Sequence, residues 1–491
     1  MKSKLVQIIE SFSYIGLEMG LFIASIGFLL ALVFSPSLSE KQFRPALLLL
    51  LAGLLFVLVL TSFSFEQTIF SSDNSPIYLF QGLFVLSKKA ILYKQAIAIG
   101  AILLVLHLWS MKYSLPTEFF VLFLAAIASL FFLLMANHWL SLYLSIEFVS
   151  ICSYLLVAIF RQKVHAEAGI KYLLVGAISS AVMLYGISFL YGLTGRLDFM
   201  ALQELFSTNQ ATWTHQVALF LGLAGLFFKL SAAPFHTYTP DVYEATPAPI
   251  ASFLAILPKI ATLFVIKGIL THLTGAFVIA LSVVILLSWI IGNFSALWQK
   301  NTKRMLGYSA IAQSGFILVA LTTTQSPSAE RAIEVYLFTY MFISINAFLL
   351  IDLLARTKNS FELDTFKGIA STNKMLGVSA VIISIALIGL PPTIGFTGKL
   401  LVFSSIWEEY GMSGQKIHII LLLFGLLNAA ISLFYYIKIP YYLIVPESEE
   451  VQKKLSNRFQ LAEWYCFSLS VFLVYLFFFP KIIYNWLLLF A

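Results

Sequence analysis

The chain has 491 residues, of which 60% are hydrophobic and 11% charged, and its mean hydropathy is +0.93. Soluble globular domains are about half apolar and about a quarter charged, so this composition excludes soluble enzymes and disordered proteins. It indicates a protein embedded in lipid. The formal net charge of +7 is typical of Lys and Arg gathered in cytoplasmic loops, and we expect no nucleic-acid partner.

The residue types that hold metals and redox groups are sparse. The two cysteines, Cys152 and Cys466, both lie in apolar runs, and the seven histidines are scattered along the chain. No cysteine or histidine spacing matches a metal or iron–sulfur motif, and no glycine-rich phosphate loop is present. We therefore expect no cofactor and no metal on this chain. The first apolar stretch is long enough to remain as a membrane span, so no cleavable signal peptide is expected.

Apolar segments long enough to cross a bilayer recur along the whole sequence. A hydrocarbon core of about 30 Å needs roughly 20 residues of helix, and helices satisfy their own backbone groups where no water is present. The sequence therefore predicts an all-α polytopic membrane protein with about 14 transmembrane helices. The predicted spans are 15–34, 45–64, 90–109, 118–136, 139–160, 168–192, 214–233, 249–270, 275–297, 304–322, 332–354, 375–407, 417–443 and 461–479.

The distribution of Lys and Arg between alternate loops predicts the orientation. Basic clusters mark cytoplasmic loops, and with the N-terminus outside they fall on the inner side; Lys88 and Lys89 run against this bias. We expect a multi-pass protein of the bacterial inner membrane with both termini periplasmic. The inward clusters are Lys41/Arg44, Arg161/Lys163, Lys300/Lys303/Arg304 and Arg356/Lys358.

Two predicted spans are interrupted by proline, the seventh at Pro234 and the twelfth at Pro391 and Pro392. Each is the fourth helix of a five-helix block, and an odd number of helices per block makes the second block inverted. Paired broken helices in inverted repeats are typical of ion and substrate pathways. The alternative is ordinary proline kinks. The predicted divisions are an N-terminal three-helix segment (1–117), two repeats (118–272 and 273–445) and a C-terminal helix (446–491).

Four charged residues lie deep in predicted spans: Glu147, Lys229, Lys259 and Lys399. A charge at the centre of a membrane helix costs roughly 2.5–3.5 kcal/mol on insertion scales, so such residues are rarely kept for packing alone. A desolvated lysine holds its proton less firmly, and a nearby carboxylate holds it in place. Glu147 with Lys229 is therefore a candidate proton switch, Lys259 a relay and Lys399 an exit-side carrier. A static ion pair that joins helices is the alternative.

Two further candidates carry less specific signals. Lys171 begins the sixth span close to Glu167, where a structural and a relay role are both open. His236 follows the break in the seventh span and is either a proton carrier or an ordinary polar contact. Asp241 and Glu244 in the same loop are expected to make loop or subunit contacts.

The motifs around these residues resemble the antiporter-like subunits of respiratory complex I, and among them the N-type subunits of bacterial proton-translocating NADH:quinone oxidoreductase, the counterparts of mitochondrial subunit 2. The resemblance covers nearly the whole chain. The stretches that carry it are Phe228-Lys229-Leu230-Ser231-Ala232-Ala233-Pro234-Phe235-His236, Pro240-Asp241-Val242-Tyr243-Glu244, Lys303-Arg304-Met305-Leu306-Gly307-Tyr308-Ser309 and Gly389-Leu390-Pro391-Pro392.

The resemblance implies a fourteen-helix subunit that translocates protons without redox chemistry of its own. It implies a Glu147–Lys229 charge pair, Lys259 as the central relay and Lys399 as its terminus, and it matches Lys171 to a family lysine. The driving reaction, quinone reduction with NAD(H), FMN, iron–sulfur clusters and quinone, would occur on other subunits. Implied partners are the adjacent antiporter-like subunit, small membrane subunits and lipid.

Two other functions remain open at the level of sequence. Subunits of multi-subunit Na⁺/H⁺ antiporters and of membrane-bound hydrogenases share this fold and this set of charges, and fold analogy does not separate them. A scaffold that retains vestigial charges is the third hypothesis. It predicts that neutral replacements of Glu147 and Lys399 leave function intact.

Overall fold

The computed structural model describes residues 8, 10–34, 51–57, 59, 76–160, 162–207, 212–270, 275–323, 326, 328–446 and 460–488. Most of the predicted span 45–64 lies outside these residues. So do Lys41, Arg44 and Arg161 of the predicted inward clusters.

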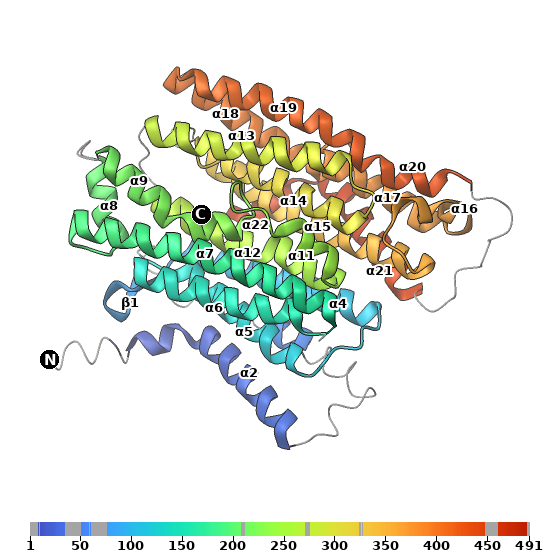
Figure 1. Cartoon of the computed structure of the whole chain (residues 1–491), viewed down its shortest axis with the longest axis horizontal. Helices are drawn as coiled ribbons and strands as arrows, with labels where there is room; N and C mark the ends of the chain where they lie inside the picture. Colours follow the sequence, from blue (N-terminus) through green and yellow to red (C-terminus); the bar gives the residue numbers. More distant parts are fainter. Residues whose placement is uncertain are drawn as a thin grey trace. The chain divides into compact units, whose positions relative to one another are not determined.

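The described chain is mainly helical, as its composition predicts (Figure 1). Nine helices within the described residues are long and apolar enough to cross a membrane. Each coincides with a predicted span within a few residues. They are α4 (Lys88–Ser110), α5 (Glu118–Met135), α6 (Trp139–Ala158), α7 (Lys163–Thr194), α12 (Ala248–Ile269), α13 (Gly275–Leu297), α15 (Ala329–Lys358), α19 (Lys416–Tyr436) continued by α20 (Lys438–Ile444), and α21 (Gln460–Phe478).

Both spans predicted to be broken are broken. The seventh consists of α9 (Trp213–Gly222) and α10 (Ala224–Lys229), and helical structure stops before Pro234. The twelfth consists of α17 (Lys374–Ile388) and α18 (Ile394–Ser413). Proline has no N–H to donate and restricts the preceding residue, which explains why both helices end ahead of these prolines. By contrast, α12 continues through Pro258.

The contacts divide the chain into two compact units, which are described separately. Unit 1 holds the described residues up to Leu230 together with 257–270. Here α2 (Gly16–Phe34) packs on α5, with the rings of Phe28 and Phe120 stacked at 5.8 Å. A methyl group on Gly186 of α7 would lie 2.1 Å from the amide nitrogen of Gly222 on α9. Small residues thus let these helices approach closely, as in other membrane bundles.

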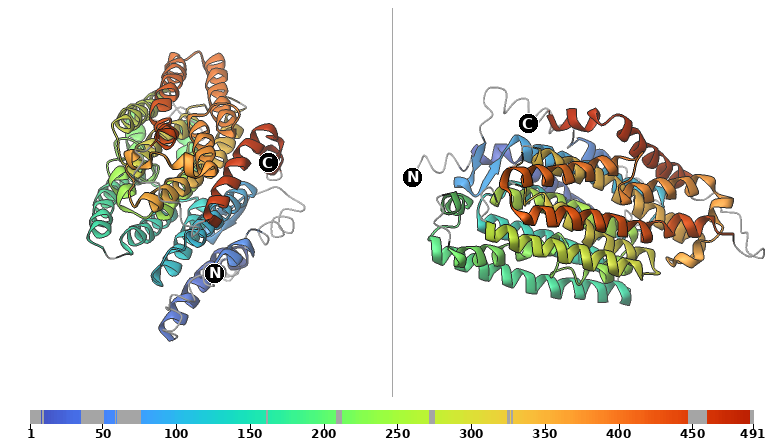
Figure 2. Two further views of the ribbon diagram at one scale, coloured as in Figure 1. Left: turned by 90° about the vertical axis from the view of Figure 1, so that its right-hand side faces the viewer. Right: turned by 90° about the horizontal axis from the view of Figure 1, so that it is seen from above.

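Unit 2 holds 231–256 and the described residues from Gly275 to Leu488. Its long helices run nearly parallel to one another (Figure 2). In it α13 packs on α14 (Thr302–Val319), where a methyl group on Gly292 would lie 2.5 Å from the nitrogen of Ala312. Helix α13 also contacts α19, where the side-chain amide of Asn293 donates to Asn428 Oδ1 at 2.9 Å.

Several short elements were not predicted from the sequence. A hairpin of β1 (Ile77–Leu79) and β2 (Phe84–Leu86) precedes α4, and its turn uses left-handed φ angles at Phe80, Gln81 and Gly82. It lies between predicted spans, so it does not conflict with helical membrane crossings. The other short elements are α8 (Phe199–Ser207), α11 (Thr239–Ala245), η3 (Leu363–Phe366), α16 (Ile369–Thr372) and α22 (Lys481–Leu488).

Candidate functional site

Lys229 is the last residue of α10 and is only 2% exposed. Its Nζ donates hydrogen bonds to Ser153 Oγ of α6 and to the Tyr172 hydroxyl of α7, both at 3.2 Å. Two neutral oxygens therefore solvate this ammonium group in place of water. Buried polar groups are kept only where such partners exist.

Aromatic rings complete the surroundings of Lys229. Its Nζ lies 5.3 Å from the ring centre of Tyr154, 5.1 Å from that of Tyr172 and 5.4 Å from that of Phe228. Rings at this range stabilise a cation through their quadrupoles. A methyl group on Gly176 would lie 1.8 Å from the Tyr154 hydroxyl oxygen, so α7 needs a glycine here for Tyr154 to reach its position.

Glu147 is half-buried on α6 and accepts a hydrogen bond from Ser180 of α7. Among the described hydrogen bonds and ion pairs, none joins it directly to Lys229, although the two charges are close enough to interact electrostatically. On α6, Glu147 lies about 9 Å along the axis from Ser153. The two members of the predicted pair are thus not in direct contact in this structure.

Lys259 follows Pro258 in α12 and is fully buried. It belongs to unit 1, as Lys229 does.

Lys399 lies in the second turn of α18 and is 5% exposed. Its Nζ donates to the carbonyl oxygens of Leu387 at 3.1 Å and Ile388 at 2.8 Å, which end α17, and lies 4.9 Å from the Phe316 ring centre. The carbonyl end of a helix carries partial negative charge and favours a cation. The break between α17 and α18 therefore gives Lys399 its ligands.

The two less specific candidates have different surroundings. Lys171 is 46% exposed and forms an ion pair with Glu167 at 3.1 Å, one turn away on α7. His236 is half-buried in unit 2, and its Nδ1 has no hydrogen-bond partner among the described residues.

Asp241 and Glu244 make the loop contacts that the sequence predicts. The Arg304 guanidinium binds Asp241 Oδ1 at 2.6 Å and Glu244 Oε2 at 2.9 Å, and so ties α11 to the start of α14. Lys303, which the sequence places in a loop cluster, is 5% exposed; it donates to the carbonyl oxygen of Thr246 at 2.9 Å and lies 4.2 Å from the Phe361 ring centre.

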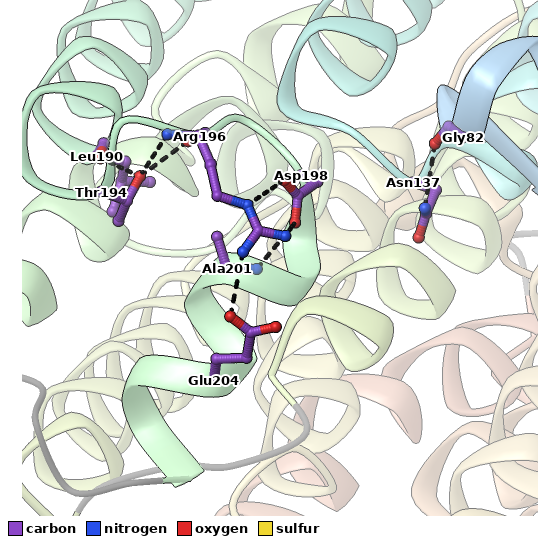
Figure 3. A network of polar contacts seen from close by, with 8 residues as sticks. All are labelled: Gly82, Asn137, Leu190, Thr194, Arg196, Asp198, Ala201 and Glu204. Carbon is purple, nitrogen blue, oxygen red and sulfur yellow. Dashed lines mark hydrogen bonds and ion pairs between the residues drawn. The ribbon is translucent and has the colours of Figure 1, made fainter.

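A second polar network fixes the segment after α7 (Figure 3). Arg196 binds Asp198 through two hydrogen bonds, at 2.9 and 3.0 Å, and Glu204 at 3.1 Å. Partial burial raises the pKa of Asp198, but hydrogen bonds from Arg196 and from the amide of Ala201 outweigh it, so the net pKa lies below its usual value of 3.8. This network is remote in sequence from the buried lysines. Its position at the surface indicates a structural role.

One buried ion pair was not singled out from the sequence. Lys94 of α4 pairs with Glu18 of α2, and their side chains are 2% and 0% exposed. Lys94 Nζ also lies 3.1 Å from the sulfur of Met135. Each of the two residues lies near the start of a predicted span, where long charged side chains commonly reach the membrane interface. The sequence feature that could have identified the pair is the presence of two opposite charges inside apolar runs.

Comparisons with known proteins show to which family the chain belongs. Residues 136–430 match the model of the family described as NADH:quinone oxidoreductase/Mrp antiporter, transmembrane. The chain is 33% identical over 397 residues to NADH-quinone oxidoreductase subunit N 2 of Chloroherpeton thalassium, an alignment that covers 76% of each protein. The chain belongs to this family. The resemblance inferred from the motifs is thereby confirmed.

Solved structures extend the family match to the fold. A chain of respiratory complex I from Thermus thermophilus superposes with a TM-score of 0.77 and 26% identity, covering 95% of this chain and 98% of that one. A chain of the Mrp complex from Dietzia sp. gives a TM-score of 0.80 at 18% identity, covering 96% of each. The second likeness shows the fold alone. As a family member, the chain is an antiporter-like, membrane-embedded subunit.

Proposed function

We propose that this chain is the N-type subunit of a proton-translocating NADH:quinone oxidoreductase and moves protons through Glu147, Lys229, Lys259 and Lys399. The observation that carries the proposal is that three lysines are almost fully buried, at 2%, 0% and 5% exposure, and that two of them lie at helix breaks. Buried lysines at discontinuous helices are the arrangement typical of ion pathways in transporters.

The switch in this scheme is the distance between Glu147 and Lys229. When the carboxylate approaches, it stabilises the ammonium form of Lys229; when it withdraws to Ser180, the lysine keeps only neutral partners and gives up its proton. Lys259 receives the proton and Lys399 passes it on. Moving one charge against the membrane potential requires about 2.3 kcal/mol per 100 mV, which redox chemistry on partner subunits would supply.

The remaining parts of the assignment follow from the same proposal. The chain would lie in a bacterial inner membrane with both termini periplasmic, and 118–272 and 273–445 would be inverted five-helix repeats. NAD(H), FMN, iron–sulfur clusters and quinone would be held by other subunits. The described residues of this chain contain no group of three or more His, Cys, Asp or Glu able to hold a metal. Lys171 and His236 would be auxiliary proton carriers.

The alternative is a subunit of a multi-subunit Na⁺/H⁺ antiporter or a membrane-bound hydrogenase. The identity to curated NADH-quinone oxidoreductase subunits favours the first function, since the likeness to the Mrp complex is at 18% identity.

Copurification from the native membrane separates these functions. We expect the tagged chain to bring down NADH-dehydrogenase or related electron-input subunits, with quinone reductase activity in the eluate. Recovery of only other antiporter subunits, without electron carriers, would contradict the proposal. Gene neighbours give an independent check of the same kind.

A further inference from the structure

Ser231 has a backbone conformation that its residue type disfavours. Its φ is +58°, in the left-handed region, and its side chain is 0% exposed. Five non-glycine residues in the described part of the chain have a left-handed φ, and of these only Ser231 is buried. In this region the Cβ of an L-residue lies too close to the following carbonyl oxygen, so residues other than glycine seldom adopt it.

Ser231 follows the helix break in the seventh span. Helix α10 ends at Lys229, with Leu230 as its C-cap, and the chain passes from unit 1 to unit 2 at Ser231. The other broken span has a glycine directly after its first helix, because Gly389 follows α17 with φ of +85°. Glycine adopts this conformation without strain. Of the two breaks, the one that adjoins Lys229 therefore has the left-handed residue with a side chain.

Two hydrogen bonds hold the segment that begins at Ser231. The hydroxyl oxygens of Ser231 and Tyr238 are hydrogen-bonded at 3.1 Å, and either of them can be the donor. The backbone N–H of Ala233 donates to Ser288 Oγ on α13 at 2.9 Å. Strained residues persist only where the surrounding structure determines their conformation. Tyr238 and Ser288 provide such contacts from two different parts of unit 2.

The same segment contains polar atoms that its conformation leaves unpaired. Thr239 Oγ1, on a fully buried side chain, and His236 Nδ1 have no hydrogen-bond partner among the described residues. Unpaired buried polar atoms are rare in folded proteins, and a reservoir of strain is one of their explanations. The left-handed serine and the unpaired atoms both raise the free energy of this conformation. An alternative conformation of residues 231–239 is thereby brought closer to it in free energy.

We propose that Ser231 is a positioning residue for Lys229, held in a left-handed conformation that it leaves during each transport cycle. The inference rests on the proposed function and deepens it, because it names a backbone position whose conformation changes together with the protonation of Lys229. Tyr238 and Ser288 stabilise the left-handed state, and the strain makes that state easier to leave. A glycine at position 231 would remove the strain and so favour the left-handed state.

The substitutions Ser231→Gly and Ser231→Ala test the role of the backbone. Both remove the hydroxyl that contacts Tyr238, so the two variants differ in whether a Cβ opposes the left-handed state. Alanine at a left-handed position is less stable than glycine by a factor of about five or more in the unfolding equilibrium constant. We therefore expect the full chain in detergent to resist denaturant better with Ser231→Gly than with Ser231→Ala.

Proton pumping is measured with the assembled complex in proteoliposomes, as the rate per complex recovered on native gels. Because Ser231 must leave the left-handed state, we expect Ser231→Gly to pump about fivefold more slowly than Ser231→Ala, the factor by which glycine favours that state. A purely structural role predicts the opposite order, in which the more stable variant pumps at least as fast. Equal rates, or faster pumping by Ser231→Gly, would overturn the proposal.

Lys112 provides a matched control away from the break. It is exposed, it has φ of +54°, and it follows the C-cap of α4. Lys112→Gly and Lys112→Ala are expected to differ in stability in the same direction as the Ser231 variants, but to pump at equal rates. If pumping differs as much between the Lys112 variants as between the Ser231 variants, the effect is a general one of left-handed residues and the proposal is wrong.

Hydrogen exchange of the Ala233 amide reports the conformational change itself, since this amide is bound to Ser288 Oγ. In the wild-type complex we expect this amide to exchange faster during turnover with NADH and quinone than at rest. The increase should be smaller in Ser231→Gly, which favours the left-handed state. The same exchange rate at rest and during turnover in the wild type would contradict the proposal.

Lys229→Met separates this inference from the proposed function. If Lys229→Met stops pumping while Ser231→Gly and Ser231→Ala pump at equal rates, the role of Ser231 is wrong and the proposed relay stands. If the assembled Lys229→Met complex pumps normally, the proposed function itself is wrong.

Discussion

At the scale of single residues, the buried cations differ in what compensates their charge. Lys229 has two neutral hydroxyls and three rings, Lys399 has two helix-end carbonyls, and Lys94 has a carboxylate. A lysine with neutral ligands can lose its proton without leaving a buried anion behind. A lysine in a tight ion pair cannot do so, which is why the proposed function uses Lys229 and Lys399 as proton carriers and leaves Lys94 with a structural role.

The Glu18–Lys94 pair makes this distinction testable. Removing one partner of a buried pair leaves an uncompensated charge and typically costs about 3–5 kcal/mol. We expect Glu18→Gln to lower the free energy of unfolding of the solubilised protein by about 3–5 kcal/mol. The double variant Glu18→Gln/Lys94→Met is expected to recover much of this loss. Denaturant unfolding followed by circular dichroism measures both.

Glu118→Gln, at the exposed start of α5, is the control for the loss of a glutamate. Pumping per assembled complex should remain normal in the double variant. Loss of pumping without loss of stability would instead place the Glu18–Lys94 pair in the relay.

The Arg196–Asp198 network predicts a pH dependence. Because the folded pKa of Asp198 is below 3.8, its ionised form contributes stability at pH above about 4, and that contribution is lost as the pH falls through the folded pKa. Arg196→Ala removes the bidentate donor, so we expect acid unfolding of this segment to begin at higher pH. Hydrogen exchange of the Ala201 amide between pH 3 and 7 measures this unfolding. The same pH dependence in Arg196→Ala and in the wild type would contradict the stabilising role of the Arg196–Asp198 contact.

The residue types explain how much of the site could be predicted from the sequence. Glu147, Lys229, Lys259 and Lys399 are conspicuous because a charge in an apolar run is energetically costly. Their partners Ser153, Tyr172 and Ser180 are not, since neutral polar residues are common in membrane helices and only their three-dimensional contacts show that they bind the charged groups. The sequence likewise does not show that Glu147 binds Ser180 and makes no direct contact with Lys229.

At the scale of elements, the helix break of unit 2 depends on Gly389. This residue caps α17 with φ of +85°, and a methyl group added to it would lie 2.6 Å from Cδ of Lys399. Gly414, which caps α18 with φ of +66°, has no atom within 4 Å of that position. The two glycines share the left-handed conformation but differ in their contact with the lysine.

Replacing each glycine by alanine separates backbone strain from displacement of Lys399. A left-handed non-glycine residue costs about 1–2 kcal/mol, so both Gly389→Ala and Gly414→Ala are expected to lower stability by this order. Only Gly389→Ala should also lower proton pumping, because it moves Lys399 relative to the carbonyl oxygens of Leu387 and Ile388. The measurement is the proton-pumping rate per assembled complex in the two variants. Equal rates would contradict the prediction that the helix break positions Lys399 for proton transfer.

Proline and hydropathy predicted the elements that matter for function, namely the long helices and both breaks. The hairpin of β1 and β2 was missed because its strands are only three residues long and its turn uses left-handed φ at Phe80 and Gln81, which residue type alone does not indicate. Helix α8 was missed because a nine-residue amphipathic segment falls below the length of a span.

At the scale of the whole molecule, membership of the family and the burial of three lysines lead to one function. The fold is shared with antiporter complexes, so the fold alone does not choose among them. The proposed function requires that electron transfer on other subunits change the protonation of Lys229.

The most direct test is proton pumping by assembled complex that carries Lys229→Met. We expect pumping and coupled quinone reduction both to fall by at least about a hundredfold, the lower end of what a positioned proton-transfer group contributes, while the complex assembles normally. Lys163→Met, which neutralises an exposed lysine at the start of α7, should leave both rates unchanged. Wild-type pumping in assembled Lys229→Met complex would contradict the account.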